Sequence, residues 1–86
     1  MTREEEIASI IKELEDANWH IYCEPYCFRY SDVNRYVDID YPYVDVYNYV
    51  DGEKYCGYLT FIELSLFNKL VNAIRLLQHK QEICYD

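Results

Sequence analysis

Two segments of the chain have the apolar spacing of an amphipathic helix. The first begins with Thr2 and Glu5, which fit a capping box that satisfies backbone amides of the first helical turn. Apolar residues then recur three and four positions apart, at Ile7, Ile10, Ile11 and Leu14. Because this spacing places them on one helix face, we predict a helix over about residues 3–16.

The second helical segment lies in the last third of the chain. It opens with another capping box, formed by Thr60 and Glu63. Its apolar stripe consists of Phe67, Leu70, Val71, Ile74 and Leu77. We predict a helix over about residues 61–79, with His79 and Lys80 at its C-terminal end. Further apolar residues widen the stripe: Phe61, Ile62, Leu64 and Leu66. They would pack on a sheet or form the seam of a homodimer.

Between these helices the period of the pattern changes to two, as in strands. We predict strands near residues 18–23, 27–30, 35–40, 43–50 and 53–59. Asp51-Gly52 is typical of a type I′ hairpin turn, and Pro42 should interrupt the ribbon between the third and fourth strands. The sequence therefore predicts one α+β domain over residues 1–86. Its order is an N-terminal helix, an antiparallel meander of three to five strands and a C-terminal helix, with both helices on one sheet face.

Strand alternation sorts the side chains of this sheet into two faces. The aliphatic face would carry Trp19, Ile21, Cys23, Val37, Ile39, Val44, Val46 and Val50. The opposite face would carry His20, Tyr22, Tyr36, Asp38, Asp40, Asp45, Tyr47, Tyr49 and Tyr58. We expect the aliphatic face to meet the helices. No third helix is predicted, so the opposite face should be exposed.

That second face is rich in tyrosine and acid, and residues 36–55 alone contain six tyrosines and five acidic residues. Tyrosine joins an apolar ring to a polar tip and is enriched at protein interfaces. Alternate carboxylates on a strand lie roughly 6.6 Å apart, close to the spacing of phosphates along a nucleic-acid strand. The candidate partner-binding residues are Tyr36, Asp38, Asp40, Asp45, Tyr47, Tyr49, Asp51 and Glu53. Tyrosine is also a good strand former, so stabilisation of the sheet is the alternative reading.

The charge distribution favours a basic protein partner. The net charge is −8, with −9 in residues 1–53 and +1 in residues 54–86. Nucleic acid and anionic membranes are disfavoured because phosphate contact needs clustered Lys and Arg. The sequence has no run of about 18 apolar residues, and its charged N-terminus lacks the apolar core of a signal peptide. We expect a cytoplasmic protein.

Candidate catalytic and metal-binding residues are sparse. His20, Cys23, Cys27 and Cys56 include one closely spaced cysteine pair, but a zinc finger needs a second pair. Cysteine–histidine catalysis through His20 or His79 lacks a glycine turn that could stabilise an oxyanion. In a cytoplasmic protein the four cysteines should be reduced. We therefore expect no enzyme, metal or other cofactor.

Two stretches resemble a known family. They are "IIKELEDANWHIY", where the first helix leads into the first strand, and "VDGEK" at the last hairpin. Over residues 7–59 the pattern is similar to small acidic phage anti-CRISPR proteins of the type that blocks the PAM-reading site of Cas9. This resemblance implies that Asp51 and Glu53 meet basic residues of the target. Lys54 stands where another acid would serve, and the C-terminal third lacks the acidic cluster of that family.

Three hypotheses follow for the function. The first is a non-catalytic inhibitor that occludes the basic nucleic-acid-binding surface of a bacterial defence nuclease. Its target would be a CRISPR effector or another nuclease in the cytoplasm of an infected bacterial host cell. The second is an immunity-type inhibitor of a nuclease toxin, and the third is a homodimeric structural or assembly module.

Overall fold

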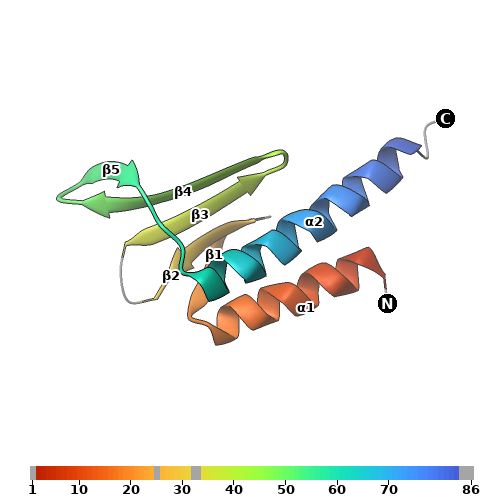
Figure 1. Ribbon diagram of the computed structural model, residues 1–86, viewed down its shortest axis with the longest axis horizontal. Coiled ribbons are helices and arrows are strands. Elements are labelled where there is room, and N and C mark those ends of the chain that lie inside the picture. Colours follow the sequence, from red (N-terminus) through yellow and green to blue (C-terminus); the bar gives the residue numbers. More distant parts are fainter. Residues whose placement is uncertain (1, 25, 32–33, 84–86) are drawn as a thin grey trace.

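The computed structural model describes residues 2–24, 26–31 and 34–83. The elements are α1 (Arg3–Asp16), β1 (Trp19–Cys23), β2 (Cys27–Tyr30), β3 (Arg35–Asp40), β4 (Tyr43–Val50), β5 (Glu53–Cys56) and α2 (Phe61–Ile83). Within these residues, five antiparallel strands form one sheet in chain order. Both helices lie side by side on one face of this sheet (Figure 1). The predicted α+β architecture is confirmed.

The first helix begins as its capping box predicts. The Thr2 hydroxyl accepts a hydrogen bond from the Glu5 amide at 3.1 Å, and the Glu5 carboxylate accepts one from the Thr2 amide at 3.3 Å. The helix ends at Asp16, and Asn18 then adopts a φ of 73°, in the left-handed region that asparagine tolerates. Asn18 therefore lies at the change of direction between α1 and β1, which begins at Trp19.

An aromatic cluster joins the helices to the sheet. Phe67 of α2 meets Trp19 and Phe28 edge to face, with ring centroids 5.1 and 5.4 Å apart. All three side chains are buried. The remaining core residues are Ile7, Ile10, Leu14, Val37, Ile39, Leu70, Ala73 and Ile74. The aliphatic face of β3 therefore packs against the helices, as predicted.

A buried ion pair lies where α2 begins. Glu63 and Thr60 form the predicted capping box, in which the Thr60 amide donates to the Glu63 carboxylate at 2.8 Å. The same carboxylate accepts hydrogen bonds from the Arg35 guanidinium at 2.7 and 3.0 Å and from the Trp19 indole at 3.2 Å. Burial alone would raise the pKa of Glu63, but the hydrogen bonds from Arg35 and Thr60 and the Arg35 charge hold it below its usual value. The capping residue thus also links α2 to the sheet.

The turns between β3, β4 and β5 follow the predictions. Tyr41 and Pro42 connect β3 to β4, and the peptide bond between them is cis. Asp51 and Gly52 connect β4 to β5 with φ values of 52° and 81°, as a type I′ turn requires. The β4–β5 hairpin then extends beyond the helix layer (Figure 1).

The last strand is shorter than predicted, because the chain leaves the sheet after Cys56 instead of after residue 59. The Gly57 amide still donates to the Val46 carbonyl at 2.9 Å. A Cβ atom at Gly57 would lie 3.0 Å from backbone atoms of Tyr47, so only glycine fits this approach without a shift. Tyr58 consequently lies in the connection to α2 and not on the tyrosine-bearing face.

Two other predictions need correction. A register shift between Ile21 and Cys23 places Cys23 opposite Cys27, on the face away from the helices. The second helix continues to Ile83 instead of ending near residue 79, and the side chains of residues 79–83 lie outside the description. The role predicted for His79 and Lys80 falls on those side chains.

Candidate functional site

The sheet face opposite the helices carries the tyrosine and acidic side chains. No element of the described chain lies over this face (Figure 1). The register places Tyr36 directly beside Tyr47, and Asp38 directly beside Asp45. We call this surface the tyrosine face: Tyr22, Tyr36, Asp38, Asp40, Tyr43, Asp45, Tyr47, Tyr49 and Lys54.

The tyrosine rings support one another. Tyr36 stacks on Tyr47 with centroids 5.2 Å apart and planes 9° from parallel. Tyr22 and Tyr49 each meet Tyr36 edge to face at 5.5 Å. Aromatic pairs in such arrangements contribute about 0.5–1.5 kcal/mol beyond the burial of their area. The packed rings therefore restrict one another's rotamers in the free protein.

Asp38 is the polar centre of the tyrosine face. Its carboxylate accepts hydrogen bonds from the hydroxyls of Tyr22 at 2.8 Å and Tyr47 at 2.9 Å. Those two hydroxyl oxygens are also 2.9 Å apart. Burial, the adjacent Tyr47 hydroxyl and the Asp38 carboxylate raise the pKa of Tyr22, and burial together with Asp38 raises that of Tyr47. Both hydroxyls therefore remain protonated donors, and Asp38 is largely committed to internal contacts.

Asp45 is paired within the chain as well. Its carboxylate lies 2.9 Å from the Lys54 ammonium, which sits 4.2 Å from the Tyr47 ring centroid. The hydrogen bond that Lys54 donates to Asp45 outweighs desolvation and raises the pKa of Lys54. Both side chains are more than half exposed, so water screens the pair and a competing cation could replace Lys54.

The predicted binding residues do not all share one surface. Asp40 and Asp45 are exposed on the tyrosine face, and Asp51 is exposed at the tip of the hairpin. Glu53 is paired with Val50 and therefore lies on the helix side, where it accepts a hydrogen bond from Tyr55 at 2.8 Å. Glu53 is accordingly separated from the three aspartates.

The predicted tyrosines differ in what they offer a partner. Tyr47 points away from the helices as expected, but its neighbours leave it only 7% exposed. Tyr36 is half-buried and Tyr49 is 40% exposed. Tyr43, which pairs with Asp40 at the start of β4, is far more exposed and was not among the candidates. Its place in the alternation of residues 43–49 was the signal that could have identified it.

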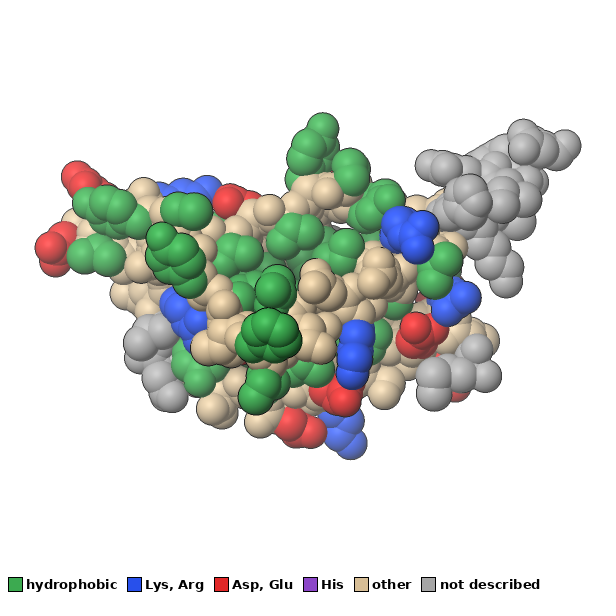
Figure 2. All heavy atoms as spheres, in the orientation of Figure 1, with side chains coloured by type: hydrophobic (Ala, Val, Ile, Leu, Met, Phe, Trp, Pro, Cys, Tyr) green, Lys and Arg blue, Asp and Glu red, His purple; other side chains and the backbone are tan. Residues whose placement is uncertain are grey.

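A second uncovered surface lies on the helix side, where the chain passes from the hairpin into α2. We call it the β5–α2 surface: Val50, Tyr55, Tyr58, Phe61, Ile62 and Leu64. Phe61, Ile62 and Leu64 were expected to pack on the sheet or to form a homodimer seam, and Tyr58 was expected on the opposite face. Phe61 is 89% and Tyr58 84% exposed. Figure 2 shows hydrophobic side chains gathered over this part of the molecule. The available signal was that Phe61 and Leu64 lie off the stripe that runs from Phe67 to Leu77.

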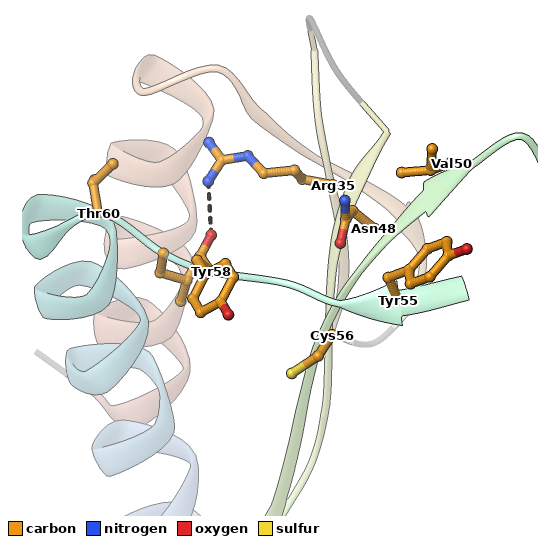
Figure 3. A pocket seen from close by; sticks show the side chains of 8 residues that line it. Arg35, Asn48, Val50, Tyr55, Cys56, Tyr58 and Thr60 are labelled. Carbon is orange, nitrogen blue, oxygen red and sulfur yellow. Dashed lines mark hydrogen bonds between the residues drawn. The ribbon is translucent and has the colours of Figure 1, made fainter. Parts of the chain in front are cut away.

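Phe61 and Leu64 of the β5–α2 surface border a depression along α2, whereas Val50, Tyr55 and Tyr58 line a separate hollow of about 710 Å³. Figure 3 shows Val50 and Tyr55 on its strand side, and Tyr58 and Thr60 toward α2. On its floor the Arg35 guanidinium donates to the Tyr58 carbonyl at 3.0 Å. Because Arg35 is paired with Glu63, its charge is largely neutralised, and most of the other lining residues offer apolar or aromatic contact.

The cysteine and histidine side chains of the described residues do not gather into a metal centre. Burial, assisted by Asp38, raises the pKa of the Cys27 thiol to about 11, which suppresses the reactive thiolate. His20 is 2.7 Å from the Ser31 hydroxyl. In residues 2–24, 26–31 and 34–83, no three His, Cys, Asp or Glu side chains gather as metal ligands would. In the same ranges, no helix has the length and apolar character needed to cross a membrane.

Comparisons with known protein families, curated proteins and solved structures find no match to this chain. The interpretation of the tyrosine face therefore depends on its own geometry and charge.

Proposed function

We propose that this protein is a non-catalytic inhibitor whose tyrosine face covers a basic surface of another protein. The target class is a bacterial defence nuclease, such as a CRISPR effector, and the occluded surface is the one that binds nucleic acid. Blocking that surface requires no reaction, only a shape and charge that compete with the phosphate backbone.

The observation that carries this proposal is the preorganisation of the tyrosine face. Tyr22 and Tyr47 are held by the Asp38 carboxylate, and Tyr36 and Tyr49 pack against their rings. A surface that already has its bound shape loses little conformational entropy on association. Exposed tyrosine then supplies contact area at the centre of an interface, where such residues often dominate the binding energy.

The unpaired acids provide the charge for recognition. Asp40 and Asp51 are exposed, and no ion pair within the described residues involves them. The molecule as a whole carries −8, so a basic partner is attracted over distances of about one Debye length, near 10 Å at 0.1 M salt. Association should therefore slow as salt rises, while the tyrosine contacts retain the complex once formed.

The test is competition for a nuclease. The immobilised protein is incubated with lysates of bacteria that express CRISPR effectors, at low salt and at about 0.5 M salt. Bound proteins are then eluted with duplex DNA, and the eluted nuclease is assayed for cleavage with and without the inhibitor. We expect capture of a basic nuclease that DNA displaces, and cleavage that is inhibited only when the protein is added before the DNA.

Matched variants separate specific docking from general acidity. Asp40→Asn with Asp51→Asn removes two charges from the proposed contact, and Glu13→Gln with Glu15→Gln removes two from the exposed side of α1. The first pair should weaken inhibition strongly and the second should not. Equal effects from both pairs, or inhibition that DNA cannot compete away, would refute occlusion by the tyrosine face.

A further inference from the structure

We infer that the β5–α2 surface binds a second copy of this chain, forming a homodimer that leaves both tyrosine faces outward. This inference goes beyond the proposed inhibition and does not depend on it. The tyrosine face lies on the side of the sheet away from the helices, whereas the β5–α2 surface lies on the helix side. One molecule could therefore use both surfaces at once.

The first argument is the exposed apolar area. An aromatic side chain offers roughly 150–250 Å², so Tyr55, Tyr58 and Phe61 together expose on the order of 400 Å² at the fractions observed. Val50, Ile62 and Leu64 bring the patch to roughly 600 Å², at the upper end of what a monomer presents. A stable interface takes about 800 Å² from each partner. The patch with a polar rim is therefore of a size that suits a dimer.

The second argument is charge. Two copies of a chain with a net charge of −8 repel each other wherever their acids face. Residues 54–86 carry a net charge of only +1, and Glu63 is already neutralised by Arg35. The helix surface next to Phe61 continues with Ser65, Asn68 and Lys69 and has no acid. Glu53, bound to Tyr55, and Asp51 at the hairpin tip are the acids beside this surface. The part of it formed by α2 carries no unpaired acid, so like charges oppose a second copy only weakly there.

The third argument is shape. Phe61 and Ile62 are exposed on the first turn of α2, which directly follows Thr60, a lining residue of the hollow of about 710 Å³. A two-fold axis makes each contact occur twice, with the projection of one copy meeting the hollow of the other. A projection beside a hollow on the same surface satisfies this requirement for self-complementarity.

The test is the oligomeric state of the purified chain without any partner. Sedimentation equilibrium over a wide concentration range should show a monomer–dimer equilibrium that depends little on salt. Phe61→Asp should raise the dimer dissociation constant by at least about 30-fold, the effect of losing an interface hot spot. Because Phe61 is almost fully exposed, circular dichroism of this variant should match that of the wild type.

The matched control is Tyr43→Asp, which places a charge on another highly exposed aromatic residue, on the tyrosine face. It should leave the dimer intact. Hydrogen exchange of the wild type should also show protection at β5 and the first turn of α2 that falls on dilution. A monomer at all concentrations, or a dimer broken by Tyr43→Asp and not by Phe61→Asp, would overturn the inference. Neither result would depend on whether a nuclease is inhibited.

Discussion

The same alternating pattern leads to opposite environments in two parts of one sheet. Val37 in β3 is fully buried, whereas Val50 in β4 is 49% exposed, although both face the helix side. The eight residues of β4 span roughly 26 Å, and its last residues extend past the beginning of α2. Burial on this face is therefore decided by how far the helices reach, and the part beyond them is exposed to solvent.

The opposite face shows the same contrast on a smaller scale. Tyr47 is enclosed by neighbouring rings and Lys54, whereas Tyr43 on the same strand faces solvent. No helix layer covers this face. Tyr47 is buried only because neighbouring side chains of the same face pack around it. Side chains on a solvent-exposed sheet face can therefore hold a defined arrangement by packing against one another.

The largest loss of stability is expected from removing the ion pair between β3 and α2, in the part of the sheet that the helices cover. Glu63→Ala should lower the free energy of unfolding by about 2–3 kcal/mol, since the partly buried Arg35 would lose its charged hydrogen-bond partner. Urea denaturation measures this loss. Glu13→Ala on the exposed side of α1 is the control and should cause no resolvable change. Similar losses for the two variants would show that the buried pair does not anchor α2.

The same pair predicts a dependence of stability on pH. The folded-state pKa of Glu63 lies below its ordinary value of 4.5. Its contribution is therefore complete above about pH 4.5 and is lost as the pH falls through the folded-state pKa. Denaturation curves measured down to about pH 3 should show this acid-side loss in the wild type and a smaller one in Glu63→Gln. The same loss of stability at low pH in both proteins would show that Glu63 is not the group responsible.

The two valines provide the direct comparison between the covered and uncovered parts. Val37→Ala should cost about 2 kcal/mol of unfolding free energy, because a buried side chain is truncated. Val50→Ala should cost less than about 0.5 kcal/mol in the monomer, because its side chain is half in water already. Denaturation at low protein concentration makes this comparison. Equal costs would mean that the hairpin is covered in solution.

The tyrosine network should be detectable by alkaline titration. The raised pKa values of Tyr22 and Tyr47 mean that both hydroxyls ionise above the ordinary value of 10.0. The stabilisation from these groups is present below pH 10.0 and declines as the pH rises through the folded-state values. In Asp38→Ala both pKa values should fall and the unfolding free energy should decrease by about 1.5 kcal/mol. NMR titration of the tyrosine rings measures the pKa values, and denaturation measures the stability. Tyr22 and Tyr47 pKa values that are the same in the variant and the wild type would rule out the hydrogen-bond network.

The smallest effect is expected at the exposed pair between Asp45 and Lys54. Asp45→Asn should leave stability unchanged within error, because both side chains are more than half exposed and water screens them. Denaturation with and without added salt checks this expectation. A clear loss that salt abolishes would show that the pair is stronger than its exposure indicates.

Much of the fold was predictable because its signals are local. Thr2 with Glu5 and Thr60 with Glu63 marked the helix starts, and Asp51-Gly52 marked the hairpin. Strand alternation also assigned Val37 and Tyr47 to opposite faces correctly. Each of these features depends on residues within a few positions of one another, so the chain encodes them without reference to the rest of the molecule.

The sequence by itself determined the order of elements, the turns, the acidic charge and the tyrosine-bearing side of the sheet. Only the tertiary structure decided which parts of each face meet water. The pairing of Arg35 with Glu63, the closure of Tyr47 and the exposure of Phe61 all depend on contacts between segments distant in the chain. The physical reason is that periodicity fixes the direction of a side chain, whereas burial depends on what lies opposite it. What lies opposite a side chain is set by the length of the helices, by how far β4 extends past them and by the close approach of Gly57 to the Tyr47 backbone.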